Sequence, residues 1–344
     1  MNIVFAILIF SLIIIFHELG HFLLAKANGI RVNEFSLGLG PTIVGFTKGE
    51  TKYCINLLPF GGACMMEGED DESDDNRSFS KKSVWARISV VVAGPVFNFI
   101  MAFILAVIVL GMAGYDEPVI SGVIPGFSAE KAGMQEGDRI IKFDHKKIHF
   151  YREISFYAYF HTKEDVSVLY ERDGKEHKTT LVPVYSEKDG RYLLGLVGNS
   201  QRTRGNVFQT LKYSVYEVKY WISTTLESLK MLVTGKVGFN DLSGPVGIVQ
   251  SIGDTYNESK SSGAYYVFLN MANICILLSA NLGVMNLLPI PALDGGRLVF
   301  LVIEAIRKKR FNPEKEGMIH YVGLILLLLL MVVIFFNDIR KIFM

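Results

Sequence analysis

The sequence has few charged residues, and neither sign is in clear excess. Charged side chains make up 20% of the 344 residues, and the formal net charge is +1. A water-soluble chain usually carries about 25% charged residues. Proteins that bind nucleic acid usually show a marked basic excess. The composition therefore argues against a freely soluble protein, and we expect no nucleic acid among its partners.

Cysteine is also scarce. The three cysteines, Cys54, Cys64 and Cys275, have no short spacing between them. An odd number without a close pair argues against a disulfide framework and against a zinc ribbon. We therefore expect three reduced thiols with a structural role.

Hydrophobic residues are abundant, at 50%, and they collect in four blocks. A membrane-spanning helix needs roughly 20 residues, and each block approaches that length. No basic residue precedes the first block and no small-residue cleavage site follows it, so we expect a retained helix rather than a signal peptide. We expect Pro95 and Asn98 to interrupt the second block near its start. The blocks are about residues 2–27, 88–113, 266–288 and 319–336.

Three regions outside these blocks have other patterns. Residues 30–60 alternate in polarity and are rich in glycine, which predicts strands and turns. Residues 115–185 contain short β-rich runs typical of a small soluble domain. Residues 207–233 predict an amphipathic helix, either at a membrane interface or packed on the soluble domain. Its aromatic residues are Tyr213, Tyr216, Tyr220 and Trp221.

The distribution of basic residues predicts an orientation. A basic run at residues 307–310 lies between the third and fourth blocks, which favours the cytoplasm for that connection. Counting crossings backwards places residues 30–87 in the cytoplasm, and the soluble domain and both termini outside. Arg340 and Lys341 near the C-terminus argue in the opposite direction.

A metal-binding pattern lies inside the first apolar block, in the run His17-Glu18-Leu19-Gly20-His21. Helical residues four apart share one face, so both imidazoles can bind one zinc ion, with Glu18 as general base. An acid at the centre of a membrane helix costs roughly 2.5–3.5 kcal/mol on insertion scales and is rarely without a role. The alternative is a helix end in water that carries ordinary interfacial residues.

A catalytic zinc ion needs a third protein ligand and one open position. Leu24 and Ala27 stand where the extended metzincin pattern has its glycine and third histidine. The candidate is Asp294, the only carboxylate within residues 261–296. Two prolines precede it and two glycines follow, and irregular backbone at membrane depth is tolerated only at a site or inside protein. A helix N-cap at the membrane surface is the alternative.

With these residues, the sequence resembles the site-2 proteases, the intramembrane zinc metalloproteases, and is most similar to their bacterial branch with an inserted PDZ domain. The resemblance covers most of the chain. It implies a polytopic α-helical membrane protein with about four transmembrane helices. It rests on HELGH at 17–21, GPVFN at 94–98, GPVGI at 244–248 and NLLPIPALDGG at 286–296.

The resemblance also implies roles for individual residues. His17, His21 and Asp294 are expected to bind Zn²⁺, and Glu18 is expected to be the catalytic base. An asparagine side chain can pair with both the donor and the acceptor of an extended peptide. We expect substrate contacts from Asn286, Pro289 and Asn98.

Two regions outside the membrane helices are also assigned by the resemblance. Residues 33–66 are expected to form a membrane-associated β-hairpin, which either aligns an unwound substrate by strand addition or only seals the zinc cavity from lipid. The run GMQEGDRII at 133–141 is similar to a PDZ domain. Such a domain binds peptides, or acts as a steric gate against substrates with large soluble parts.

The expected organisation has four regions. Residues 1–114 form an N-terminal membrane domain, residues 115–200 an extracytoplasmic PDZ-like α+β domain, residues 201–265 an amphipathic or interfacial linker, and residues 266–344 a C-terminal membrane domain with the third ligand. By resemblance, the chain lies in a bacterial plasma or inner membrane, with its active site in the bilayer towards the cytoplasmic side.

Two functions of different classes follow. The first is an intramembrane zinc endopeptidase that cleaves single-span membrane proteins, such as anti-sigma factors or remnant signal peptides. The alternative is a non-enzymatic membrane scaffold with a PDZ peptide-binding module and a structural metal, which would need a closed four-ligand site. A transporter is weaker, because no inverted repeat is visible. The expected partners are transmembrane substrates and the lipid bilayer, and no pattern indicates an oligomeric state.

Overall fold

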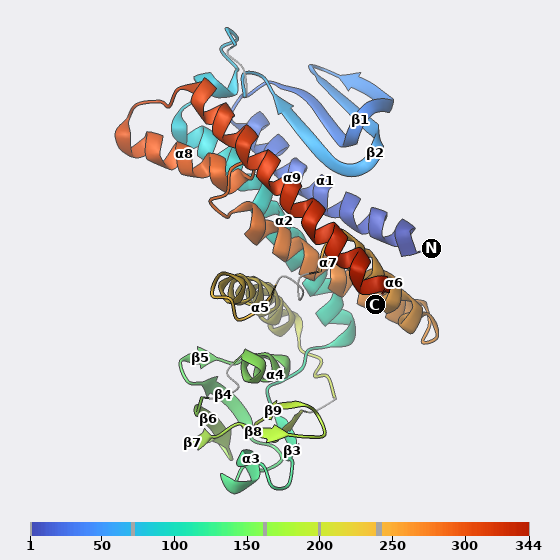
Figure 1. The fold of residues 1–344 in the computed structure, drawn as a ribbon, viewed down its shortest axis with the longest axis vertical. Helices are drawn as coiled ribbons and strands as arrows, with labels where there is room; N and C mark the ends of the chain where they lie inside the picture. Colours follow the sequence, from blue (N-terminus) through green and yellow to red (C-terminus); the bar gives the residue numbers. More distant parts are fainter. Residues whose placement is uncertain (1, 70–72, 161–163, 199–200, 239–242, 344) are drawn as a thin grey trace. The chain divides into compact units, whose positions relative to one another are not determined.

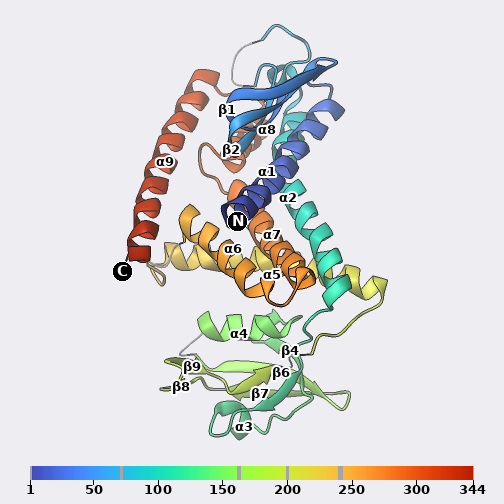
Figure 2. The same ribbon diagram turned by 90° about the vertical axis from the view of Figure 1, so that its right-hand side faces the viewer.

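The computed structural model describes residues 2–69, 73–160, 164–198, 201–238 and 243–343. Its backbone is drawn in Figures 1 and 2. The chain divides into two compact units, one made of residues 1–106 and 221–344 and the other of residues 107–220.

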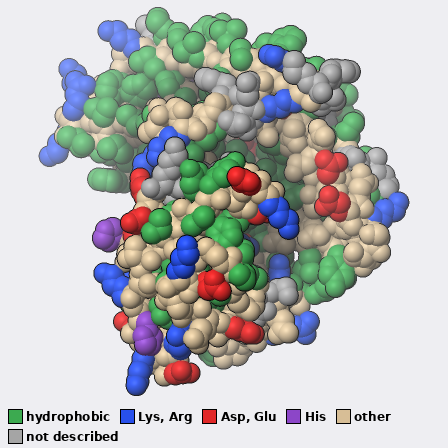
Figure 3. Space-filling view, turned by 60° about the horizontal axis from the view of Figure 1, so that its bottom comes forward, with side chains coloured by type: hydrophobic (Ala, Val, Ile, Leu, Met, Phe, Trp, Pro, Cys, Tyr) green, Lys and Arg blue, Asp and Glu red, His purple; other side chains and the backbone are tan. Residues whose placement is uncertain are grey.

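Four helices are long and apolar enough to cross a membrane, and they coincide with the four predicted blocks. Large hydrophobic side chains remain exposed along them, and hydrophobic side chains cover broad areas of the face seen in Figure 3. Such surface suits contact with lipid. The helices are α1 (Asn2–Ala27), α2 (Val84–Ala113), α7 (Ala264–Asn286) and α9 (Pro313–Phe343).

The predicted interruption of the second block is wrong, because α2 is continuous through Pro95 and Asn98. Prolines are tolerated inside membrane helices that pack against neighbouring helices. Here His21 of α1 donates to the carbonyl oxygen of Val90, and Ser279 of α7 donates to that of Asn98. Both neighbouring helices thus contact α2 close to Pro95.

Helices α1, α2 and α7 pack together with α6 (Pro245–Lys260). A shared apolar cluster includes Ile13 of α1, Met101 of α2, Cys275 of α7 and Ile252 of α6. Helices α1 and α2 approach most closely at Gly20, where an added Cβ would lie 2.4 Å from the carbonyl oxygen of Ala93. The glycine of the HELGH run is therefore needed for the contact between the two helices.

A long β-hairpin lies against α1 in Figures 1 and 2. It consists of β1 (Val32–Lys48) and β2 (Thr51–Met66), which pair antiparallel with several register shifts. Large apolar side chains on it are exposed, among them Ile43 and Phe46. At its turn, Glu50 pairs with Lys26 at 2.7 Å and with Arg77 at 2.6 Å, and these cations hold the pKa of Glu50 below its usual value. The turn is thus attached to the end of α1.

The chain after α7 is irregular until α8 (Asp294–Arg307) begins, as the two prolines predict. Two glycines at the start of α8 allow it to fold back closely. An added Cβ on Gly295 would lie 2.1 Å from the carbonyl oxygen of Leu288, and one on Gly296 would lie 2.4 Å from that of Ile290. The break between α7 and α8 therefore depends on both prolines and both glycines.

Helix α9 has few buried residues and stands apart from α1, α2 and α7 in Figure 2. It is attached near both ends. Its His320 accepts a hydrogen bond from the backbone N–H of Ala292 at 3.0 Å. Its buried Asp338 accepts from the N–H groups of Gly244 and Gly247 at 3.0 and 2.9 Å, and so caps the start of α6.

The second unit has its own core. A four-stranded sheet has the order β5-β4-β6-β7, and two smaller sheets pair β10 with β3 and β8 with β9. Fully buried residues such as Phe143 and Val168 lie at its centre. The elements are β3 (Ile120–Val123), α3 (Ser128–Lys131), β4 (Arg139–Phe143), β5 (Lys146–Lys147), α4 (Tyr151–Phe160), β6 (Val166–Arg172), β7 (Lys175–Leu181), β8 (Val184–Ser186), β9 (Arg191–Leu193) and β10 (Leu196–Gly198).

The predicted helix at 207–233 has the same bounds in the structure, as α5 (Val207–Val233). Two of its aromatic rings face residues of the second unit. Tyr213 stacks on Tyr115 with ring centres 3.6 Å apart, and Tyr216 lies 3.8 Å from the ring of His149. These rings pack on the domain, which agrees with the second interpretation of this helix.

Candidate metal centre

Three side chains converge between α1 and the start of α8. His17 and His21 lie on one face of α1, and Asp294 is the first residue of α8. The Asp294 Oδ2 atom lies 3.2 Å from Nε2 of His17 and 3.4 Å from Nε2 of His21, and the two Nε2 atoms are 3.2 Å apart. Both histidines are buried. The structure thus brings together the three predicted ligands, from opposite ends of the chain.

The spacing of these atoms fits a zinc ion. Zinc–ligand bonds of about 2.0–2.1 Å in a tetrahedron separate neighbouring ligand atoms by about 3.3 Å. The three measured separations, 3.2, 3.2 and 3.4 Å, bracket this value. The Oδ2 atom of Asp294 is also buried without a hydrogen bond in the described part of the chain. Two imidazoles and a carboxylate are a donor set that zinc accepts, and they leave one position of a tetrahedron open.

The outer nitrogen of each imidazole is held by α2. Nδ1 of His21 donates to the carbonyl oxygen of Val90 at 2.9 Å, and Nδ1 of His17 lies 3.2 Å from the Asn98 side-chain amide. Between these two contacts, Gly94 lies directly on the rings. An added Cβ there would be 2.3 Å from Nε2 of His21. The Gly-Pro-Val-Phe-Asn run of α2 therefore forms the back wall of the site.

Glu18 lies beside the three ligands and lines the same cavity of about 410 Å³. The β2 strand borders the cavity on the other side. The backbone N–H of Cys64 hydrogen-bonds to the Glu18 carboxylate, and an added Cβ on Gly62 would lie 3.0 Å from Cγ of Glu18. The hairpin thus contacts the predicted general base and lines the cavity.

The three residues with predicted substrate contacts are placed differently. Nδ2 of Asn286 lies 3.4 Å from Nε2 of His17, so this amide reaches the centre from the end of α7. Pro289 is exposed in the connection between α7 and α8. Asn98 is completely buried, at 0% exposure, and leaves no surface for a substrate.

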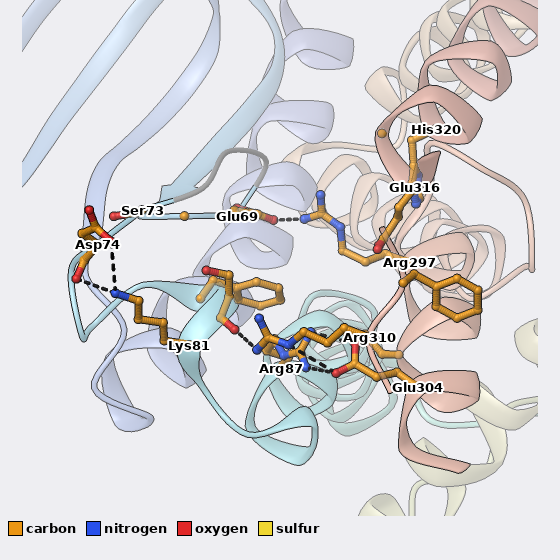
Figure 4. A pocket seen from close by; sticks show the side chains of 16 residues that line it. Glu69, Ser73, Asp74, Lys81, Arg87, Arg297, Glu304, Arg310, Glu316 and His320 are labelled. Carbon is orange, nitrogen blue, oxygen red and sulfur yellow. Dashed lines mark hydrogen bonds and ion pairs between the residues drawn. The ribbon is translucent and has the colours of Figure 1, made fainter. Parts of the chain in front are cut away.

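A second, polar cavity of about 790 Å³ shares Glu69, Arg297 and His320 with the site cavity (Figure 4). An ion pair joins Glu69 to Arg297. In the lining of the same cavity, Arg87 of α2 pairs with Glu304 of α8 at 2.5 Å. Sequence reasoning missed these pairs. No pattern within one helix reveals a partner more than 200 residues away.

Comparisons with known proteins give matches over almost the whole chain. The model of peptidase family M50 matches residues 5–330. A relative from Clostridium acetobutylicum is 39% identical over 98% of this chain and 97% of its own length. The zinc metalloprotease RasP of Geobacillus kaustophilus is 33% identical over 100% of this chain and 99% of its own length. The regulator of sigma-W protease RasP of Bacillus subtilis is 31% identical over 98% of both chains.

Among solved structures, the PDZ domain of an SdrC-like protein from Listeria monocytogenes is similar to part of the chain. The match covers 24% of this chain and 86% of that domain, with 19% sequence identity and a TM-score of 0.22. A score this low carries no argument about the fold of the second unit.

Proposed function

The chain belongs to peptidase family M50, the site-2 protease family of zinc metalloproteases, and from this premise we propose that His17, His21 and Asp294 hold its catalytic zinc ion. The observation that carries the proposal is the convergence of their three ligand atoms, all within 4.8 Å of one another. No fourth histidine, cysteine or carboxylate joins this group within the described residues. A closed structural site, as a scaffold would need, is therefore not favoured.

The chain's own residues divide the chemistry among them. When bound, zinc activates a water molecule and polarises the scissile carbonyl. Glu18 takes a proton from the attacking water and returns it to the leaving amine. Asn286, whose amide reaches the centre, holds the substrate backbone near the ligands. Hydrolysis of a peptide bond follows from these roles.

The proposed substrates are membrane-spanning segments of single-span proteins. Four helices able to cross a membrane surround or adjoin the site, which makes such a segment the natural ligand. A helical substrate hides its scissile carbonyl in hydrogen bonds, so cleavage requires extended backbone. The β1–β2 hairpin offers strand edges beside Glu18 for this purpose. One relative is named a regulator of sigma-W protease, and an anti-sigma factor is the corresponding candidate substrate.

The second unit is proposed to be a PDZ-like domain on the extracytoplasmic side. Its β-rich sheet with two short helices is consistent with this class. The basic run at 307–310 supports a cytoplasmic position for the α8–α9 connection, and hence the orientation. The domain then either binds a substrate peptide or excludes substrates with large soluble parts.

The test is Glu18→Gln, which keeps the shape of the side chain and removes the base. We expect cleavage of a reconstituted transmembrane substrate to fall at least about 100-fold, since general bases contribute 10²–10⁴-fold. Zinc content should stay at the wild-type level, because the three ligands are unchanged. His17→Ala and Asp294→Ala should lose zinc. Full activity of the glutamine variant, or full zinc content of the alanine variants, would overturn the proposal.

A further inference from the structure

The side chain of Asn98 contacts His17, a proposed zinc ligand, but does not line the cavity beside the site. It is fully buried on α2, and its amide lies 3.2 Å from Nδ1 of His17. Its backbone carbonyl accepts a hydrogen bond from Ser279 of α7 at 2.8 Å. Both α1 and α7 therefore contact α2 at this residue, and the Asn98 side chain faces one ring nitrogen of one proposed ligand.

A neutral imidazole has one protonated nitrogen and one nitrogen with a free lone pair. In both histidines Nε2 faces Asp294, so Nε2 must carry the lone pair if it is to bind zinc. The proton must then sit on Nδ1. A hydrogen-bond acceptor beside Nδ1 selects this tautomer.

His21 meets this requirement through the backbone. Its Nδ1 lies 2.9 Å from the carbonyl oxygen of Val90, which can only accept. His21 is therefore locked with its proton on Nδ1 and its lone pair on Nε2. No side-chain substitution at residue 90 can remove this acceptor.

His17 depends on a side chain instead. An amide presents Nδ2 or Oδ1 after a half-turn about its Cβ–Cγ bond. With Nδ2 towards His17, the amide would donate to Nδ1, place the proton on Nε2 and block the metal. In that orientation the buried Oδ1 also lacks a hydrogen bond in the described part of the chain. With Oδ1 towards His17, Nδ1 donates and Nε2 is free.

We propose that Asn98 is a positioning residue, whose Oδ1 accepts the Nδ1 proton of His17 and so presents Nε2 to zinc. The inference rests on the proposed ligand set. It replaces the expected substrate contact of Asn98 by a role behind the ligand. Outer partners of metal-binding histidines typically contribute 10–100-fold to metal affinity.

The experiment compares zinc affinity, measured by chelator competition on purified full-length protein, for two variants of similar size. Asn98→Leu has no acceptor, and Asn98→Asp keeps one. We expect the leucine variant to bind zinc about 10–100-fold more weakly and the aspartate variant to bind within a few-fold of wild type. The aspartate rescue separates tautomer control from packing, because both variants remove the native amide.

Two controls keep the outcomes distinct. Ser279→Ala removes the hydrogen bond to the Asn98 backbone but not the amide, and should leave zinc affinity nearly unchanged. The variant His17→Ala tests whether His17 is a zinc ligand. If His17→Ala binds zinc like wild type, the proposed function fails. If His17→Ala loses zinc while Asn98→Leu binds normally, or if the leucine and aspartate variants are equally weak, only the present inference is overturned.

Discussion

Gly94 decides how closely α2 approaches the two histidines. An added Cβ would lie 2.3 Å from Nε2 of His21 and 2.7 Å from Cε1 of His17. Real Cβ atoms do not approach other heavy atoms so closely, so a side chain here would push both rings away from Asp294. Because Gly94 has no side chain, α2 leaves room for the two imidazole rings of the proposed ligands.

We predict that Gly94→Ala lowers zinc affinity at least about 10-fold. The added methyl group would disturb the orientation of both imidazoles, and losing the groups that orient metal-binding side chains typically costs 10–100-fold in affinity. Zinc stoichiometry under chelator competition is the measurement. Gly111→Ala on the same helix is the control, since its Cβ would meet only ordinary contact, at 3.9 Å. Equal zinc affinity of the two variants would show that the rings can move aside freely.

Sequence alone predicts the ligands better than their supports. His17 and His21 are recognisable by helical spacing, and Asp294 by its isolation as a carboxylate in a proline-broken apolar segment. Asn98 carries no such signal. Its contact with His17 depends on the rotation and height of α2 against α1, which neither helix specifies by itself.

At the scale of elements, α8 is held in place by ionic contacts far from its first residue, Asp294. Glu304 pairs with Arg87 of α2 at 2.5 Å and lies 3.6 Å from Arg310 (Figure 4). The Arg87 and Glu304 side chains are only 8% and 13% exposed. Arg310 donates to the carbonyl oxygen of Ser80. The end of α8 is thus fixed to the segment that begins α2.

We predict that Glu304→Leu destabilises the protein by about 3–5 kcal/mol, because it leaves the buried Arg87 without its carboxylate. Arg87→Leu should cost less, because Glu304 keeps its contact with Arg310. The double variant should be more stable than the sum of the single effects predicts. Thermal unfolding in detergent measures all three.

Glu227→Gln is the control for that cycle. Its pair with Lys230 is exposed, and exposed pairs contribute at most about 1 kcal/mol. If the two leucine substitutions prove strictly additive, the pair is not coupled and does not hold α8.

The elements differ in how well the sequence predicts them. The observed bounds of α5 agree with the predicted range 207–233, because its amphipathic period begins and ends sharply. The break between α7 and α8 lies where the sequence predicts it, because two prolines mark the position. The expected interruption of α2 is wrong because a proline can stay inside a membrane helix that packs against neighbouring helices, and the local sequence does not show this packing. Local patterns thus predict elements, but not what tertiary contacts permit within them.

At the scale of the molecule, residues 116–202 of the second unit are bounded by two adjacent segments of the chain. Tyr115 and Thr203 exchange backbone hydrogen bonds of 3.0 and 2.9 Å. The chain therefore enters and leaves this part at nearly the same point. All three proposed zinc ligands, Glu18 and Asn98 belong to the other unit. Residues 116–202 are thus joined to the rest of the chain as an insertion would be.

We predict that deleting residues 116–202, with a short glycine linker between Tyr115 and Thr203, leaves zinc content unchanged. Cleavage of a transmembrane substrate with short flanks should also remain and should still depend on Glu18. Metal analysis and cleavage of a panel of substrates with short and long flanks are the measurements. Cleavage of long-flank substrates by the deleted form alone would identify the domain as a gate, and loss of zinc would refute its independence.

The proposed zinc ligands come from α1 and α8, and this has a consequence for the order of events on the ribosome. At about 5–20 residues per second, Asp294 is synthesised roughly a quarter of a minute to a minute after His21. During that interval the nascent chain carries two imidazoles and a base, but no complete site for the metal. On this assignment, the third zinc ligand joins the site only when synthesis is almost finished.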